Sequence, residues 1–426
     1  MKKTIIAMAV AATTSFGAQA LEIHKPDAAF LEQVGVVGIT QDNWEEENES
    51  LTYQQAYKFT HYVKMHTGDY VWNLGETKQL LDLDKLTGND FDGEYPLSTI
   101  IPFRLKMEAL VVLKDGKLVH EQYWNGMHKA KTHLEMSAGK SYTGILLSTF
   151  VAEGRVNMKD QLTKYLPELK GTGWDGATVE QVADMRSGIE VIKTPGKMVD
   201  ERQSETQDWN GPSKYDYKNI IEVAQTLGQR SDVKRGEAFE YLCMNTEMLA
   251  MLMERLEGKR YVEILEERLF KPMGAEYDAE MMTNRNGEAV ASGGHHVTAR
   301  DGAKLMDLLM NDGKNRKGEQ VVPKKFIDDL IEGNDEVKSA WKHDGFSALL
   351  ADAWYKDQIR VLNVDGRRFI AFVGVSGQVT VGEPATKTVI KTFGSQDQMQ
   401  HPRTVAMTFL DVMPTLLKAV DGLTLN

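Results

Sequence analysis

The chain has 426 residues, of which 42% are hydrophobic and 26% charged, and its formal net charge at pH 7 is -12. This composition is that of an ordinary globular protein, which excludes disordered, collagen-like and polytopic membrane proteins. An acidic surface repels phosphate groups, so we expect no nucleic-acid partner and no binding to anionic membranes. The length allows two or three domains, or one large α/β unit with a helical insertion.

Residues 1–20 have the pattern of a secretory signal peptide. Two lysines precede an apolar run over residues 4–13, and the sequence Ala-Gln-Ala ends at Ala20. This order predicts cleavage near Ala20. The apolar run is too short to span a bilayer, and Leu21 is not the cysteine of a lipoprotein. We therefore expect a periplasmic or secreted protein without a stable membrane anchor.

The chain contains a single cysteine, Cys243, so no internal disulfide can form. Stability must therefore come from a hydrophobic core. No Cys/His cluster with zinc spacing is present. His295 and His296 are adjacent and would point in different directions on a helix or strand, so we expect no metal site.

The predicted elements begin with a weakly patterned segment. Tyr53 to Met65 predicts a helix, and residues 82–95 predict a loop. A β-hairpin follows, with strands at residues 109–113 and 117–124 joined by an Asp-Gly turn. Ser137 to Glu153 then predicts a helix that is apolar around most of its circumference, which is typical of a helix at the centre of a protein.

The middle of the chain is predicted to be mainly helical, and the C-terminal part returns to strands. A long polar loop is expected over residues 190–212. The predicted helices are residues 179–185, 219–227, 246–256, 261–270, 301–310 and 404–420, and the predicted strands are residues 368–374, 378–381 and 386–393. Strands thus flank a helical middle. We predict an α/β fold of the α+β type, in which both chain ends form one antiparallel sheet flanked by helices and the middle forms a helical lobe.

A candidate catalytic pair lies at the start of the predicted central helix. Ser137 and Lys140 form an S-x-x-K motif, and residues three apart share one helix face, so the ammonium can reach the hydroxyl. Free N–H groups at a helix start favour a developing alkoxide, and burial should lower the pKa of the lysine. Alone, these four residues favour an N-cap serine and a helix-end lysine over a catalytic pair.

The surrounding residues resolve this ambiguity. Five stretches occur in the order typical of one family: 110–123 (LVVLKDGKLVHEQY), 136–146 (MSAGKSYTGIL), 151–169 (VAEGRVNMKDQLTKYLPEL), 173–189 (GWDGATVEQVADMRSGI) and 293–310 (GGHHVTARDGAKLMDLLM). The chain resembles the serine β-lactamase/penicillin-recognising hydrolases, in the class C-like branch that includes esterases and 6-aminohexanoate-dimer hydrolase.

The resemblance implies a β-lactamase/transpeptidase-like fold and a division of the chain. Residues 105–426 would form the hydrolase domain, with its helical lobe at about 155–340. Residues 21–104 would form an N-terminal extension that packs on it. Ser137 would be the nucleophile and Lys140 its partner, and the chemistry needs no cofactor.

The second motif of the family is a tyrosine followed two residues later by asparagine or serine. Tyr241 is the candidate, and it would relay the proton of the serine; otherwise it is a packing residue. The chain departs from the pattern, because Cys243 stands where the amide or hydroxyl is expected. We interpret Cys243 as a small buried residue rather than a nucleophile, and Asn245 as the candidate replacement in substrate binding.

The third motif of the family is usually K-T-G or H-T-G, but this chain has GVSGQ over residues 374–378. Related esterases carry a similar G-x-x-G-Q. By this resemblance the backbone N–H groups of Ser137 and Val375 would form the oxyanion hole, and Gly377 and Gln378 would contact the substrate. The missing lysine or histidine argues against efficient β-lactam hydrolysis.

The sequence thus predicts a serine hydrolase that cleaves a small-molecule ester or amide through an acyl-enzyme on Ser137. One alternative is a β-lactamase or D,D-peptidase. The other is a non-catalytic binding protein of the same fold, which the presence of Ser137, Lys140 and Tyr241 disfavours. The sequence specifies neither the substrate nor the oligomeric state.

Overall fold

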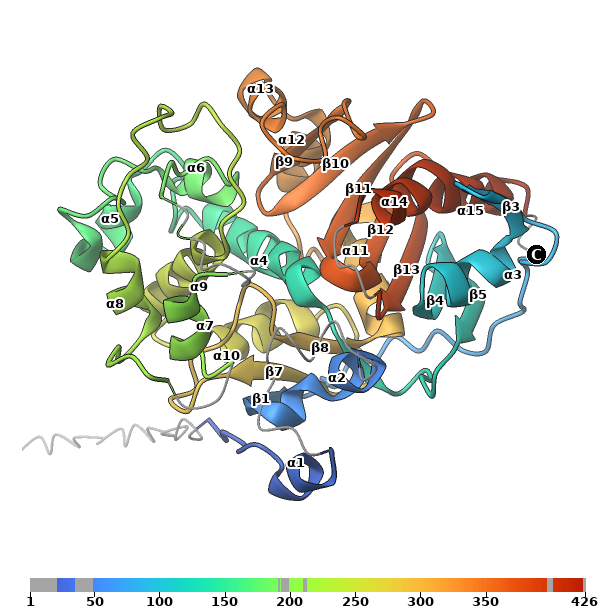
Figure 1. Ribbon diagram of the computed structural model, residues 1–426, viewed down its shortest axis with the longest axis horizontal. Coiled ribbons are helices and arrows are strands. Elements are labelled where there is room, and N and C mark those ends of the chain that lie inside the picture. The colour runs from blue at the N-terminus through green and yellow to red at the C-terminus, as the bar shows by residue number, and fades with distance from the viewer. Residues whose placement is uncertain are drawn as a thin grey trace, which may run out of the picture.

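The computed structural model describes residues 21–34, 49–190, 192, 199–209, 213–396 and 401–423. The predicted signal peptide lies outside these ranges. A sheet with its covering helices forms one part of the molecule and a mainly helical region forms the other, with α4 (Lys140–Ala152) between them (Figure 1). In the described part of the chain, no helix combines the length and the apolar character needed to cross a membrane.

The large sheet has seven strands, and every neighbouring pair is antiparallel. In spatial order they are β5 (Lys117–Tyr123), β4 (Met107–Lys114), β13 (Thr388–Gly394), β12 (Gln378–Glu383), β11 (Arg367–Gly374), β10 (Ile359–Val364) and β9 (Ala353–Lys356). Strand β4, from the N-terminal half of the chain, pairs with β13 from its C-terminal end. The prediction of one antiparallel sheet built from both chain ends is confirmed.

The hairpin β4–β5 follows from its turn residues. Asp115 and Gly116 have φ angles of 45° and 72°. A two-residue hairpin turn that matches the twist of the strands needs positive φ at both positions, which the Asp-Gly pair tolerates.

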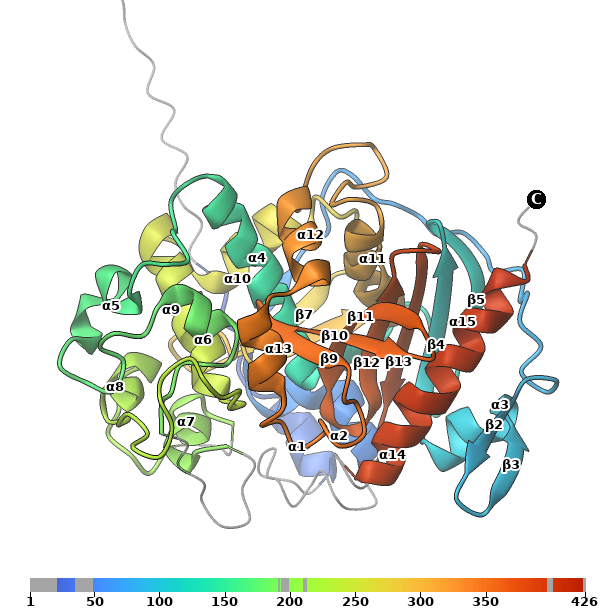
Figure 2. The ribbon, with the colours of Figure 1, turned by 90° about the horizontal axis from the view of Figure 1, so that it is seen from above.

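Both faces of the sheet are buried. Alternate residues of β4 belong to different cores: Ala109, Val111 and Leu113 to one, and Leu110 and Val112 to the other. Helix α11 (Ala299–Met310) covers the first face. The second face is covered by α14 (Pro402–Ala406), the π-helical turn Met407–Val412 and α15 (Met413–Asp421), which run along the sheet in Figure 2. The sheet is therefore the middle layer of three.

The helical region packs around α4, whose residues are nearly all buried. Its helices are α5 (Leu162–Tyr165), α6 (Val179–Ala183), α7 (Glu201–Thr206), α8 (Ile220–Gln225), α9 (Cys243–Glu257) and α10 (Tyr261–Leu265), the last followed by the π-helical turn Glu266–Phe270. Helix α7 lies where a loop was predicted over residues 190–212, so that prediction is wrong for 201–206. The side chain of Asp200 accepts a hydrogen bond from the Arg202 N–H and caps α7.

A second sheet of four antiparallel strands was not predicted. Its order is β1 (His61–Met65), β7 (Ala279–Thr283), β8 (His295–Thr298) and β6 (Thr132–Leu134). The helix predicted over 53–65 is wrong in its second half, because α2 (Glu49–Gln55) and the 3-10 turn Ala56–Phe59 lead directly into β1. The loop predicted over 82–95 contains a hairpin of β2 (Thr87–Asp90) and β3 (Gly93–Pro96).

The remaining elements are short or peripheral. They are α1 (Ala28–Val34), α3 (Leu97–Thr99) with the π-helical turn Ile100–Arg104, the 3-10 turn Pro167–Leu169, α12 (Lys324–Glu332) and α13 (Asp335–Trp341). Helix α13 ends at Trp341, whose indole N–H donates to the Leu350 carbonyl at 2.8 Å. This bond fixes the loop between α13 and β9, which borders the pocket described below.

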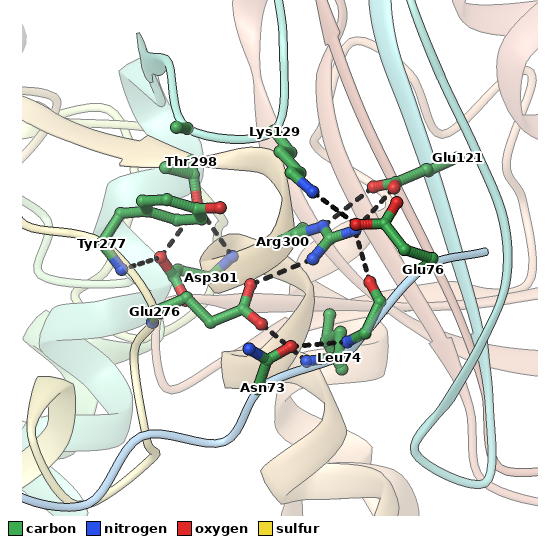
Figure 3. A network of polar contacts seen from close by, with 12 residues as sticks. Asn73, Leu74, Glu76, Glu121, Lys129, Glu276, Tyr277, Thr298, Arg300 and Asp301 are labelled. Atoms are coloured by element: carbon green, nitrogen blue, oxygen red, sulfur yellow. Dashed lines mark hydrogen bonds and ion pairs between the residues drawn. The ribbon is translucent and has the colours of Figure 1, made fainter.

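A buried charge network fastens the chain at Leu74 and Gly75 to the rest of the molecule (Figure 3). The Arg300 guanidinium on α11 donates to both carboxylate oxygens of Glu121 on β5, at 2.9 and 2.6 Å, and to the Gly75 carbonyl at 2.8 Å. The Glu276 carboxylate accepts the Leu74 N–H at 2.6 Å and lies 3.4 Å from Arg300. The network therefore ties the N-terminal segment to the large sheet and to α11.

Candidate active site

Ser137 lies on a sharp turn at the junction of the two parts of the molecule. It belongs to the 3-10 helix Met136–Gly139, which follows β6 and leads into α4. Met136 has a φ of 49°, a left-handed conformation that non-glycine residues rarely adopt, so the backbone is strained directly before Ser137. Beneath this turn, the buried Glu135 carboxylate accepts hydrogen bonds from Lys391 at 2.6 Å and from the Tyr142 hydroxyl at 3.1 Å. This support fixes the backbone that presents Ser137.

Lys140 is the first residue of α4 and is 1% exposed. Its Nζ donates to Ser137 Oγ at 3.0 Å and to the Ser292 carbonyl at 2.7 Å. The structure therefore brings the two residues of the S-x-x-K motif into contact across one turn.

The second acceptor of Lys140 is itself held in place. The Glu247 carboxylate on α9 accepts the backbone N–H groups of Ala291 at 3.2 Å and Ser292 at 3.0 Å. The next strand, β8, begins at His295, whose ring lies directly against Gly139, so that a side chain at position 139 would collide with it. Glu247 and Ser292 carry no motif of their own, so this support could not be predicted from the sequence.

Tyr241 lies in the irregular segment before α9, and its ring centroid is 4.9 Å from Lys140 Nζ. Cys243 is the first residue of α9 and the sole free thiol, and it too is near Lys140. Serine, lysine and tyrosine thus form one cluster, with the cysteine at its edge. The interpretation of Cys243 as a small buried residue is wrong, since the residue is partly exposed.

The protonation of Lys140 differs from the expectation drawn from burial. Burial lowers the pKa of Lys140, but the ionised forms of Cys243 and Tyr241 raise it, and the net effect is a raised pKa. Lys140 therefore holds its proton at neutral pH and acts as a hydrogen-bond donor to Ser137. The expectation of a lowered pKa is therefore wrong, because Cys243 and Tyr241 outweigh the effect of burial on Lys140.

The GVSGQ turn meets the Ser137 turn. A Cβ on Gly374 would lie 3.1 Å from the Ala138 backbone nitrogen and would strike the Glu135 carbonyl, so only glycine permits this approach. Val375 follows directly and lines the same pocket as Ser137. Ser376 has a φ of 62°, and its Oγ accepts a hydrogen bond of 2.8 Å from the hydroxyl of Tyr53 on α2. The N-terminal segment therefore braces this turn.

Two residues predicted to bind substrate lie elsewhere. Gln378 is buried, and its side-chain amide donates to the Val375 carbonyl at 3.1 Å and the Gly394 carbonyl at 2.7 Å. It fastens the turn and does not line the pocket. Asn245 is also buried, with its amide 3.3 Å from Met185 Sδ. Gly377 does line the pocket.

One pocket is lined by four of the candidate residues: Ser137, Tyr241, Val375 and Gly377. Besides Ser137 and Tyr241 it is lined by the loop after α13, by β10–β12 and by the C-terminal helix: Trp341, Asp344, Phe346, Leu350, Arg360, Leu362, Val373, Gly374, Val375, Gly377, Val379, Gln396, Thr404, Val405, Thr408 and Phe409. Most of these side chains are apolar. A mostly apolar pocket with a few convergent polar groups is the usual form of a small-molecule site. Among the described residues, no group of three or more His, Cys, Asp or Glu side chains is arranged to hold a metal ion.

Comparison with known proteins adds independent information. A family model described as Beta-lactamase matches residues 105–390. The 6-aminohexanoate-dimer hydrolase of Paenarthrobacter ureafaciens is 30% identical over 290 residues, which cover 68% of this chain and 72% of that protein.

Solved structures show the same fold. A candidate 6-aminohexanoate-dimer hydrolase from Bacillus anthracis superimposes with a TM-score of 0.75 at 22% identity, covering 89% of this chain and 97% of the other. An octameric penicillin-binding protein homologue from Pyrococcus abyssi superimposes with a TM-score of 0.57 at 16% identity, covering 76% of each chain. The β-lactamase/transpeptidase-like fold predicted from the sequence is confirmed.

Proposed function

Because the chain belongs to the Beta-lactamase family and is a hydrolase of that fold, we propose that it is a secreted or periplasmic serine hydrolase acting on small-molecule esters or amides. The observation that carries this proposal is the hydrogen bond of 3.0 Å between Lys140 Nζ and Ser137 Oγ at the pocket wall. Secretion rests on the sequence pattern of residues 1–20.

The proposed reaction proceeds through an acyl-enzyme. Ser137 Oγ attacks the carbonyl carbon of the substrate and gives its proton to the Tyr241 oxygen, while the phenolic proton of Tyr241 passes to the leaving group, so that the C–O or C–N bond to that group breaks and the acyl-enzyme forms. The charge on the carbonyl oxygen is stabilised by the N–H groups of Ser137 and Val375. The Lys140 ammonium donates to Ser137 Oγ and lies 4.9 Å from the ring centroid of Tyr241, so it orients the two groups between which the proton moves. Water then attacks the acyl-enzyme, which restores the Ser137 hydroxyl and releases the acid.

The two alternative functions, a β-lactamase or D,D-peptidase and a non-catalytic binding protein, would each require a different set of residues in this site. β-Lactam or peptidoglycan substrates carry a carboxylate that the family binds through a lysine or histidine of its third motif, and residues 374–378 contain neither. A non-catalytic binding protein would not need a lysine donating to Ser137. An esterase or amidase accounts for both features.

The test is covalent labelling and turnover. Incubation with a fluorophosphonate should add one label to Ser137, detected by mass spectrometry of the peptide, and Ser137→Ala should lose the label and the hydrolysis of p-nitrophenyl esters. Loss of a nucleophile lowers kcat by several orders of magnitude. The matched control is Ser141→Ala, on the next turn, because Ser141 Oγ donates to the Gln358 carbonyl and does not line the pocket. Retention of turnover in Ser137→Ala would contradict the proposal.

A further inference from the structure

Exposed apolar side chains gather at one corner of the molecule. Among the described residues, the large hydrophobic side chains that are exposed are Val71, Phe91, Phe103 and Leu410. Phe91 lies in the turn between β2 and β3 and is 85% exposed, and Phe103 lies on the π-helical turn after α3 and is 76% exposed. Leu410, on the π-helical turn after α14, is 38% exposed. These last three residues form what we call the corner patch, where β2, β3 and α3 project beside the C-terminal helices (Figure 2).

The first two side chains of the corner patch are held together by ion pairs. Asp90 and Asp92 stand on either side of Phe91 in the sequence. Both carboxylates accept hydrogen bonds of 2.7 Å from the guanidinium of Arg104, which follows Phe103. The β2–β3 turn is therefore fixed against the π-helical turn, and the two rings belong to one rigid surface.

The same hairpin is bound to the C-terminal helices. The Asn89 N–H donates at 2.7 Å to the carboxylate of Asp411, which follows Leu410. Arg403 on α14 donates to both carboxylate oxygens of Asp90. The charged groups beside the rings are thus bonded to one another. The corner patch consequently offers a partner apolar atoms and no isolated ion, which suits an uncharged surface.

The size of the corner patch argues against a protein partner. An aromatic side chain buries about 150–250 Å² when it is fully covered, so two phenylalanines and a partly exposed leucine offer about 300–400 Å². A stable interface with a second copy of the chain would bury about 800 Å² on each copy. A lipid surface needs no complementary area, because each ring gains free energy separately when it leaves water for the acyl-chain boundary.

We propose that the corner patch docks the protein reversibly onto a lipid bilayer with zwitterionic headgroups, by inserting Phe91 and Phe103 at the boundary between headgroups and acyl chains. This inference goes beyond the proposed function and does not depend on the proposed nucleophile. The docked surface adjoins the pocket, because Thr408 and Phe409 of the π-helical turn after α14 line it. The net charge of -12 makes an anionic bilayer the poorer partner.

The experiment measures how the purified protein partitions onto sucrose-loaded vesicles of palmitoyl-oleoyl phosphatidylcholine, by sedimentation over a range of lipid concentrations. Binding should be as strong at high salt as at low salt, because it depends on apolar burial. Full burial of a phenylalanine side chain changes an equilibrium constant by about tenfold to a hundredfold. Phe91→Ser and Phe103→Ser should therefore each lower the partition coefficient by about tenfold or more, and the double variant should remain in the supernatant.

The matched control is Val71→Ser, at the exposed hydrophobic side chain outside the corner patch. Its neighbour Trp72 donates to the Gly274 carbonyl, which also accepts a hydrogen bond from Lys304 on α11. Val71 therefore belongs to the α11 side of the large sheet, and Val71→Ser should bind vesicles as the wild type does. Because the exchanged side chains are exposed, every variant should unfold at the wild-type temperature, which separates a loss of binding from a loss of folding.

Four results would overturn the inference. The first is a wild-type protein that stays in the supernatant at every lipid concentration, and the second is a double variant that binds as the wild type does. The third is binding only to phosphatidylglycerol vesicles that high salt releases, which would indicate an electrostatic contact. The fourth is a wild-type dimer in sedimentation velocity that becomes monomeric in the double variant, which would make the corner patch a protein interface.

Discussion

His295 should make the folded protein sensitive to mild acid. The imidazole is completely buried beneath Gly139, and burial, together with the charge of Lys140, lowers its pKa from 6.5 to about 3. Below pH 6.5 the imidazole is therefore protonated in the unfolded chain but stays neutral in the folded protein. The free energy of unfolding consequently falls as the pH drops from 6.5 towards 3, and His295 does not change it above pH 6.5. One pH unit corresponds to about 1.36 kcal/mol, and pH 5 lies one and a half units below 6.5, so His295 lowers the free energy of unfolding at pH 5 by about 2 kcal/mol.

The variant His295→Gln removes this proton uptake. Urea unfolding at pH 7.5 and pH 5 should show that the difference in unfolding free energy between the two pH values is about 2 kcal/mol smaller in His295→Gln than in the wild type. The matched control is His343→Gln, at an exposed histidine, which should show the wild-type difference. An unchanged pH dependence in His295→Gln would refute the conclusion that a neutral imidazole supports the Ser137 turn.

Three further predictions concern the reaction. Lys140→Ala and Tyr241→Phe should each slow single-turnover acylation greatly, and the double variant should be little slower than the poorer single one, because groups that act as a unit are non-additive; additive losses would indicate independent roles. Tyr53→Phe removes the donor to Ser376 and should lower kcat on short esters severalfold by loosening the Val375 turn, whereas an unchanged kcat would mean that the bond is only structural. Short activated esters should be hydrolysed with a higher kcat/KM than a chromogenic cephalosporin, since the GVSGQ turn lacks a cation; the opposite order would identify a β-lactamase.

The features that the sequence predicted correctly depend on local chemistry. The Asp115-Gly116 turn defines its hairpin through backbone φ angles alone. Ser137 and Lys140 meet because they are one helical turn apart, whatever surrounds them. The three C-terminal strands β11–β13 were found because their apolar runs are bounded by turn residues, although β12 extends to Glu383, two residues beyond its predicted end.

The features that the sequence did not predict depend on distant partners. Strand β8 has four residues, all buried, and its pairing with β6 joins residues more than 160 positions apart. Nothing in a run of four residues distinguishes such a strand from a helix segment. The role of Gln378 was misjudged for the same reason, since its acceptor on Gly394 belongs to another strand. The raised pKa of Lys140 likewise arises from groups about 100 residues away.

The N-terminal segment belongs to the architecture of the site even though the family match begins only at residue 105. Strand β1 pairs with β7, which in turn pairs with β8, the strand that packs His295 against Gly139. From the other side, Tyr53 holds Ser376 and thereby the turn that carries Val375. The two N–H groups proposed to stabilise the oxyanion thus sit on turns that are each supported by residues preceding the matched region. A chain that kept Ser137, Lys140 and Tyr241 but lacked this segment would retain the reactive groups without the contacts that fix their geometry.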